Sequence, residues 1–289
     1  MIQNLNVFGY CSSGYTGLMP TPDAPRHNDL DAHSPREIAA LVEAVGVVKA
    51  RLPVLNTLVL GVLAGAFIAF GAMFATLVTT GNDLGFGINR LVGGIAFSLG
   101  LILVVVGGAE LFTGNNLIVM AWADRKITAR QLLRNWGLVF AGNFVGALGA
   151  AVLVYLSGVL QLGDGAVAAA ASQTATAKVA LPFTEAFFRG VLCNALVCLA
   201  IWLCFAAHTV SGKILAIIFP ISAFVALGFE HSIANMYFIP LGWLLDADGV
   251  TLASFLGNLI PVTLGNIVGG SLFVALVYWL VYLRRPNAE

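Results

Sequence analysis

Two side chains that can exchange protons adjoin each other in an otherwise apolar stretch. Glu230 and His231 stand in the segment "LGFEHSIANMYFIP", residues 227–240. The imidazole of histidine has an unperturbed pKa of about 6.5, so it gives or takes a proton near neutrality. Ionisable groups inside a membrane span are rare and by default mark a functional site. We therefore predict that His231 is a proton-exchanging group; the alternative is a core histidine satisfied by hydrogen bonds.

The surroundings of this pair recur earlier in the chain. The segments "GAELFTGN" (108–115) and "GFEHSIAN" (228–235) both read Gly-x-Glu-x-x-x-small-Asn, 120 positions apart. The segments "NWGLVFAGNFVG" (135–146) and "NLIPVTLGNIVG" (258–269) share Asn-x6-Gly-Asn-x-Val-Gly, 123 positions apart. Two matching pairs predict a chain built from two related halves.

The first matched pair also predicts two breaks within apolar stretches. Irregular backbone is tolerated at membrane depth only where it is buried in protein or lines a polar cavity. Half-helix N-termini that meet there carry partial positive charge and suit a small anion. We expect Glu110 and Glu230 to accept the N–H groups of these breaks or to cap the half-helices, because a bare carboxylate would repel an anion. Asn115 and Asn235 are expected to support the broken helices with them.

The composition requires a membrane around these elements. The chain has 289 residues, is 59% hydrophobic and 10% charged, and has a mean hydropathy of +0.93. A soluble domain would carry roughly 25% charged residues, and each membrane-spanning helix needs about 20 apolar residues. We predict an all-α polytopic membrane protein with six transmembrane helices in a 3+3 inverted repeat, of which the second and fifth are broken. The six apolar stretches lie near residues 54–80, 91–123, 132–158, 183–207, 214–244 and 252–282.

The distribution of basic residues predicts the orientation. With six spans, eleven of the fourteen Lys and Arg residues fall on the side that carries both termini. By the positive-inside rule this side is cytoplasmic. We expect a multi-pass protein of a bacterial-type inner membrane, in contact with lipid, with both termini in the cytoplasm.

The chain divides into four predicted segments. The first is rich in Gly, Ser, Pro, Asn and Asp and reads as a tail without fixed structure. In the second, Ser34, Pro35 and Glu37 form the start signal of an amphipathic helix that lies on the inner membrane surface or on a neighbouring subunit. The segments are a mobile cytoplasmic tail (1–33), this cytoplasmic helix (34–51), a transmembrane pore domain (52–283, with repeats at about 54–158 and 183–282) and a short cytoplasmic tail (284–289).

Other chemistries lack their signatures. The sequence contains no His-Glu-x-x-His or Gly-x-Ser-x-Gly motif, and its four cysteines do not have zinc spacing. The paired Asn-Pro-Ala motifs of an aquaglyceroporin are also missing. A membrane enzyme that used Glu230 and His231 as acid and base would need a further nucleophile or a metal. The sequence therefore predicts no enzymatic activity, metal, cofactor or nucleic-acid partner.

From about residue 35 to 285 the sequence resembles the formate/nitrite transporter family. The motifs that carry the resemblance are "LVGGIAFSLGLIL", "GAELFTGN", "NALVCLAIW", "GFEHSIAN" with "MYFIP", and "NLIPVTLGNIVGG". The resemblance implies an aquaporin-like fold and a homopentamer in which each subunit has its own pore.

The resemblance also implies roles for individual residues. It makes His231 the central histidine, Thr113 its hydroxyl partner on the opposite broken helix, and Asn194 the asparagine of "NALVCLAIW". It places hydrophobic constrictions at Phe97 and Leu101 on one side of the histidine and at Phe224 on the other side. It assigns Lys178 to the outer vestibule.

These roles suggest how a small anion crosses. Lys178 and the helix ends concentrate the anion at the mouth. His231 gives it a proton, so that neutral formic or nitrous acid passes the apolar constrictions, where a charge is costly. The sequence leaves passive anion flow, H⁺ symport and an alternating-access symporter open. Formate is the first expectation and nitrite the second, because "ELFTGN" also resembles the nitrite branch; a hydrosulfide- or lactate-conducting relative is a further alternative.

Overall fold

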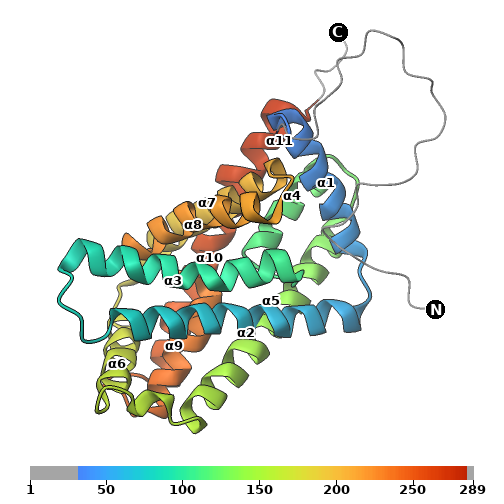
Figure 1. Ribbon diagram of the computed structural model, residues 1–289. Coiled ribbons are helices and arrows are strands. Elements are labelled where there is room, and N and C mark those ends of the chain that lie inside the picture. Colours follow the sequence, from blue (N-terminus) through green and yellow to red (C-terminus); the bar gives the residue numbers. More distant parts are fainter. Residues whose placement is uncertain (1–31, 285–289) are drawn as a thin grey trace, which may run out of the picture.

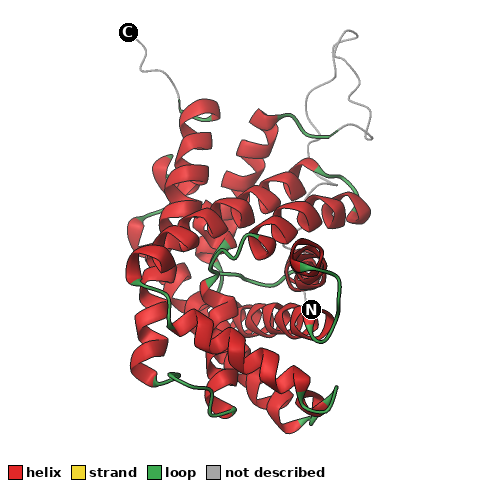
Figure 2. Cartoon of the chain, turned by 90° about the vertical axis from the view of Figure 1, so that its left-hand side faces the viewer, coloured by secondary structure: helices red, strands yellow, loops and turns green. Residues whose placement is uncertain are grey.

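The computed structural model describes residues 32–284, and every regular element in this part of the chain is helical (Figures 1 and 2). The predicted tails, 1–33 and 284–289, fall almost entirely outside the described residues. The elements are α1 (Pro35–Arg51), α2 (Val54–Thr79), α3 (Phe86–Gly107), the 3-10 helix η1 (Gly114–Ile118), α4 (Val119–Ala123), α5 (Ala129–Leu156), the 3-10 helix η2 (Val159–Gln161), α6 (Ala166–Val179), α7 (Phe183–Ala206), α8 (Val210–Ala226), α9 (Ser232–Leu244), α10 (Leu252–Ile267), the π-helix η3 (Val268–Leu276) and α11 (Val277–Tyr282).

Five helical segments are long and apolar enough to cross a bilayer. They are α2, α3, α5, α7 and the continuous run Leu252–Tyr282, with mean hydropathies between 1.9 and 2.4. The helix α8 is apolar but has only 17 residues. The first helix, α1, begins at a capping box in which Ser34 and Glu37 bind each other's backbone N–H groups.

Two of the six predicted apolar stretches are interrupted. The helix α3 ends at Gly107, and helical structure resumes at Gly114; α8 ends at Ala226, and α9 begins at Ser232. Gly108 (φ 81°) and Gly228 (φ 73°) start the two interruptions in the left-handed region, which is costly for residues with a Cβ. They are also the first residues of the two matching motifs, so each motif begins where a helix ends.

Backbones of neighbouring helices touch at Gly146 and Gly269, the last residues of the two segments that share Asn-x6-Gly-Asn-x-Val-Gly. A Cβ added to Gly146 on α5 would lie 1.9 Å from the Val62 carbonyl oxygen of α2. A Cβ added to Gly269 in η3, which directly continues α10, would lie 2.1 Å from the Val191 carbonyl oxygen of α7. Such approaches need glycine. They bring α2 against α5 and α7 against η3, which continues α10, and the interruptions bond to these helices.

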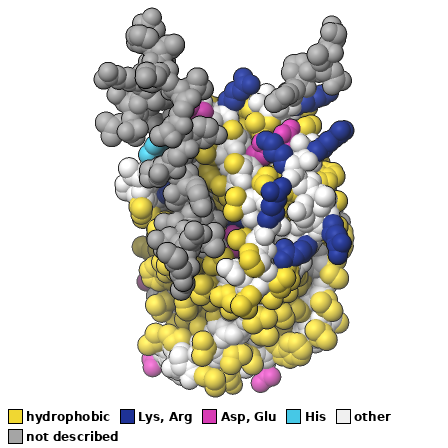
Figure 3. Space-filling view, turned by 90° about the vertical axis from the view of Figure 1, so that its right-hand side faces the viewer, with side chains coloured by type: hydrophobic (Ala, Val, Ile, Leu, Met, Phe, Trp, Pro, Cys, Tyr) yellow, Lys and Arg dark blue, Asp and Glu magenta, His cyan; other side chains and the backbone are white. Residues whose placement is uncertain are grey.

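The two ends of the molecule differ. The helices α1 and α11 contact each other at one end, whereas α6 and α9 contact each other at the opposite end (Figure 1). On the face shown in Figure 3, Lys and Arg gather at one end and hydrophobic side chains form a band beyond them. Many large apolar side chains on the helix surfaces are exposed, as a lipid or subunit contact requires.

Candidate functional site

His231 and Thr113 meet between the two interruptions. The Nε2 atom of His231 lies 2.9 Å from Oγ1 of Thr113, and both residues are buried. The other ring nitrogen, Nδ1, accepts the N–H of Ala234 at 3.1 Å and thereby caps α9. Because Nδ1 accepts this bond, the proton of the neutral ring lies on Nε2, where it is donated to the Thr113 hydroxyl. The only mobile proton of the ring therefore points at the opposite interruption.

Asn194 fixes the backbone beside this pair. Its Nδ2 donates to the carbonyl oxygen of Thr113 at 3.2 Å, to Oδ1 of Asn116 at 2.7 Å and to the carbonyl oxygen of Asn266 at 2.7 Å. Since Asn194 is fully buried on α7, it ties the first interruption to α10.

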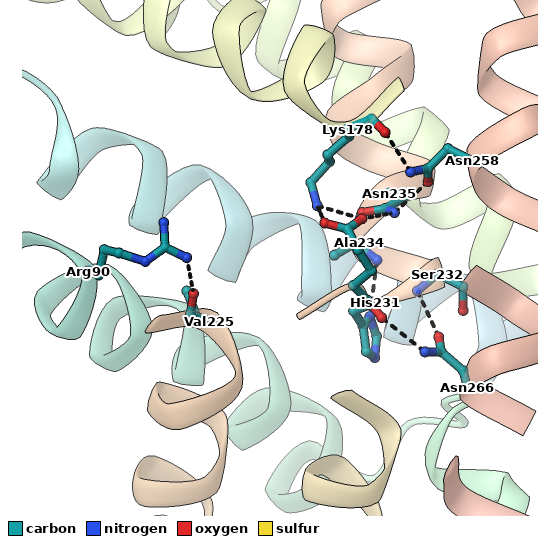
Figure 4. A network of polar contacts seen from close by, with 10 residues as sticks. Arg90, Lys178, Val225, His231, Ser232, Ala234, Asn235, Asn258 and Asn266 are labelled. Atoms are coloured by element: carbon teal, nitrogen blue, oxygen red, sulfur yellow. Dashed lines mark hydrogen bonds and ion pairs between the residues drawn. The ribbon is translucent and has the colours of Figure 1, made fainter. Parts of the chain in front are cut away.

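Glu230 belongs to a closed ring of polar groups with Lys178, Asn235 and Asn258, the three residues of the ring that are labelled in Figure 4. Its carboxylate binds Nζ of Lys178 at 2.9 and 3.1 Å and accepts Nδ2 of Asn235 at 2.6 Å. Asn235 also donates to Oδ1 of Asn258 at 2.7 Å, and Asn258 donates to the backbone carbonyl of Lys178 at 2.8 Å. A buried carboxylate is stable only when it is paired in this way.

Glu110 belongs to a second ring of the same design. Its carboxylate binds Nζ of Lys49 at 3.0 Å and accepts Nδ2 of Asn115 at 2.6 Å. Asn115 also donates to Oδ1 of Asn135 at 3.0 Å, and Asn135 donates to the carbonyl of Lys49 at 3.1 Å. The lysine of α1 thus has the same place in this ring as the lysine of α6 has in the other.

The N–H groups of the interruptions are held by asparagines rather than by carboxylates. Oδ1 of Asn143 accepts the N–H of Phe112 at 2.9 Å, and Nδ2 donates to the carbonyl of Glu110 at 2.9 Å. Oδ1 of Asn266 likewise accepts the N–H of Ser232 at 2.9 Å. The remaining bonds of the two amides go to the carbonyls of Gly61 (2.8 Å), Gly190 (2.9 Å) and Glu230 (3.0 Å).

One sequence expectation needs correction here, and one pair of residues was missed. The structure gives Glu110 and Glu230 side-chain partners in place of the expected backbone N–H groups. Asn143 and Asn266, the shared "GN" of the second repeated motif, were not assigned a role. Their repetition is visible in the sequence. Their role, to bind backbone groups of the two interruptions, depends on the fold and is not visible there.

The hydrophobic residues are arranged differently from the prediction. The rings of Phe97 and Phe224 have centroids 5.5 Å apart and cross at 83°. Phe224 also stacks on His231, with centroids 6.0 Å apart. The prediction that put Phe97 and Phe224 on opposite sides of the histidine is therefore wrong. The cause is the close packing of α3 on α8, where a Cβ on Gly94 would lie 2.6 Å from the Ser222 carbonyl oxygen.

A cavity of about 580 Å³ opens above this aromatic pair. We call it the Lys178 vestibule; its lining includes Arg90, Phe97, Lys178, Arg189, Phe224 and His231. Toward the other end of α3, a cavity of only about 40 Å³ is lined by Val104, Asn115 and, from α1, Lys49. Leu101 is buried and lies on α3 between the residues that line the two cavities. The space around the site is therefore wide at one end and nearly closed by α1 at the other.

The helix α1 is held in place by a charge cluster outside the apolar spans. Glu43 is buried and binds Nζ of Lys126, which also lies 3.3 Å from the Asp124 carboxylate. Burial raises the pKa of Glu43 above its usual value, and the hydrogen bond from Lys126 offsets this only in part. This cluster joins α1 to the loop after α4.

A sequence model described as "Formate/nitrite transporter" matches residues 36–280. The chain belongs to the formate/nitrite transporter family. This confirms the resemblance seen in the sequence. The formate channel FocA of Escherichia coli strain K12 is 43% identical over 279 residues, which covers 90% of this chain and 98% of the relative.

Two solved structures match this family member in fold. "Pentameric formate channel with formate bound" has a TM-score of 0.75 and 39% identity, and covers 80% of this chain and 98% of its own. "FNT family ion channel" has a TM-score of 0.79 and 33% identity, and covers 85% and 98%. All three relatives are named as channels. Together with the apolar helices, they support a multi-pass membrane protein and a formate or nitrite channel.

Proposed function

We propose that this protein is a channel for small monovalent anions, formate first and nitrite second, in which His231 exchanges a proton with the permeating anion. One observation carries this proposal: the ring presents its Nε2 proton to Thr113 at the floor of a positively lined vestibule. The aromatic pair beside it, Phe97 and Phe224, makes the next step costly for a charged species.

The proton balance follows from the two ring nitrogens. Loss of the Nε2 proton leaves a neutral ring only if the ring was an imidazolium, with a second proton on Nδ1. That nitrogen accepts the N–H of Ala234 in this structure, so proton uptake costs the cap of α9. Transfer from Nε2 to a formate oxygen then gives formic acid and a ring that carries its hydrogen on Nδ1. The Thr113 hydroxyl donates to the vacated Nε2, and the acid crosses uncharged.

The proposed architecture is six spans in a 3+3 inverted repeat, with α3–η1–α4 and α8–α9 as the broken second and fifth spans. The two equivalent lysine–glutamate–asparagine rings and the two equivalent glycine contacts support it. We further propose an aquaporin-like homopentamer of pore domains (52–283) in an inner membrane, with both termini and α1 in the cytoplasm. The pentameric relative and the clustered Lys and Arg support this arrangement.

Formate flux into proteoliposomes tests the proposal, with nitrite and sulfate as comparison anions and an internal dye that reports pH. We expect formate and nitrite to enter and sulfate to stay outside, because one proton neutralises only a monovalent anion. Formate entry no faster than in protein-free liposomes would refute the proposed function.

A specific observation favours a second candidate, an alternating-access H⁺ symporter. The Lys178 vestibule has a volume of about 580 Å³, whereas the cavity toward the α1 end has only about 40 Å³. A carrier that is open to one side has such an asymmetry. Current recording separates the two. A channel in which the anion returns its proton to His231 beyond the constriction moves net charge and gives a measurable unitary current, whereas a symporter releases one proton with each anion and carries no net current.

A further inference from the structure

Two guanidinium groups converge over Gly228 in the Lys178 vestibule. A Cβ added to Gly228 would lie 2.9 Å from Nη2 of Arg90 and 4.0 Å from Nη1 of Arg189. The two arginines come from different helices, α3 and α7. The Arg90 guanidinium therefore packs directly on the Cα of Gly228, where any Cβ would displace it, and the Arg189 guanidinium borders the same residue.

Other contacts fix both arginines without using all their donors. Arg90 donates from Nε to the carbonyl of Ala226 and from Nη2 to the carbonyl of Val225 at 2.9 Å, the last turn of α8 (Figure 4). Arg189 donates from Nη2 to Glu185 at 3.0 Å. Within residues 32–284, Nη1 of neither arginine has a hydrogen-bond partner. Both arginines line the vestibule.

The excess positive charge of the vestibule lies on this pair. Three cations and one carboxylate line the cavity, and the carboxylate, Glu230, is bound to Lys178. Arg189 has an exposed partner in Glu185, whose charge is screened by solvent. Among the described residues, no carboxylate lies within ion-pair distance of Arg90. An incoming anion is thus drawn more strongly to the arginine pair than to Lys178.

We propose that Arg90 and Arg189, which meet beside Gly228, form an anion-binding site, upstream of the aromatic pair, for a small carboxylate or other oxyanion. This inference rests on the proposed function, since it names where the permeating anion first binds. Guanidinium groups match planar oxyanions and replace part of their water shell. Sulfate fits the site by charge and shape, but one proton from His231 leaves it charged, so it binds without passing.

The test uses proteoliposomes sorted so that the Lys178 vestibule faces outward. Formate flux is measured against formate concentration, and block is measured with sulfate added outside. For Arg189→Gln we expect a half-saturating formate concentration about 3- to 10-fold higher, a maximal flux within about twofold, and a similar loss of sulfate block. Sulfate added to the α1 side is expected to have no effect.

Two variants keep the test decisive. Glu185→Gln removes the exposed partner of Arg189, so sulfate block is expected to strengthen, the opposite direction. Arg130→Gln makes the same charge change at an exposed residue of α5, on a part of the chain that does not line the vestibule, and is expected to change neither quantity. If the wild type conducts formate but Arg189→Gln leaves half-saturation and block unchanged, the site is refuted while the proposed function stands. If the wild type conducts no formate, the proposed function itself fails.

Discussion

Replacing His231 by Asn separates proton exchange from structural support. The ring of His231 both presents its Nε2 proton to Thr113 and caps α9 through Nδ1. Asparagine is among the best N-cap residues, so its side-chain oxygen replaces the bond from the Ala234 N–H. It has no titratable group near neutrality. We therefore expect His231→Asn to assemble normally while it loses proton exchange.

The size of the effect follows from the aromatic pair above the histidine. Without a proton, formate passes Phe97 and Phe224 as an anion, and the effective penalty for burying an ion is several kcal/mol. An uncompensated penalty of only about 3 kcal/mol slows passage about a hundredfold, since each 1.36 kcal/mol is a factor of ten. Formate flux in the variant is thus expected to fall about a hundredfold and to lose its dependence on pH.

The measurement is formate flux into proteoliposomes between pH 5 and 8, with oligomer size checked in detergent. His208→Asn is the matched control, because His208 stacks on His33 outside the vestibule. That variant should keep the wild-type rate and pH profile. If His231→Asn assembles and keeps the full pH dependence, then His231 is only a helix cap and the proposed proton transfer is wrong.

Three further predictions concern stability and the placement of α1. Glu230→Gln leaves Lys178 buried without a counter-ion and should cost about 3–5 kcal/mol, seen as a large drop in the thermal unfolding midpoint. Gly146→Ala puts a Cβ 1.9 Å from the Val62 carbonyl oxygen and should abolish assembled protein on size-exclusion chromatography. Because burial raises the folded pKa of Glu43 above its ordinary value of 4.5, the contribution of Glu43 to the docking of α1 is full below about pH 4.5 and is lost as pH rises through the folded pKa. Hydrogen exchange of residues 35–51, corrected for intrinsic rates, measures this, and Glu43→Gln should remove the pH dependence.

Matched controls make each of these predictions refutable. Glu185→Gln breaks only an exposed pair and should cost about 1 kcal/mol or less, so an equal loss in both variants would contradict the buried-pair argument. Gly149→Ala meets no atom within 4 Å and should assemble. If the protection of α1 against hydrogen exchange increases with pH, the pH dependence derived for Glu43 is wrong.

The sequence predicted the central residues of the site, His231 and Thr113, better than the contacts of the buried carboxylates around them. The interruptions begin at Gly108 and Gly228, where polar motifs repeat within apolar stretches, and such a pattern is readable without coordinates. The family resemblance linked His231 to Thr113, and their side chains lie 2.9 Å apart. The partner of each buried carboxylate was not readable, because the lysine that binds Glu110 lies 61 residues earlier, on the separate helix α1.

The contact between Phe97 and Phe224 could not be predicted from the sequence for a related reason. Whether Phe97 and Phe224 meet depends on how far α3 and α8 slide along each other. Uniformly apolar helices carry no pattern that sets this position. The contact at Gly94 sets it instead, and a glycine in a sequence does not state which backbone approaches it.

The two lysine–glutamate pairs also have a consequence for biogenesis. A charged residue at the centre of an inserting helix costs about 2.5–3.5 kcal/mol at the translocon. Lys49 precedes Glu110 in the chain and Lys178 precedes Glu230, so each carboxylate enters the bilayer after its own cation has been synthesised. Each carboxylate can therefore be neutralised as soon as its own segment is inserted. The contact of His231 with Thr113 joins the two interruptions, so the functional centre is completed only after both have been inserted.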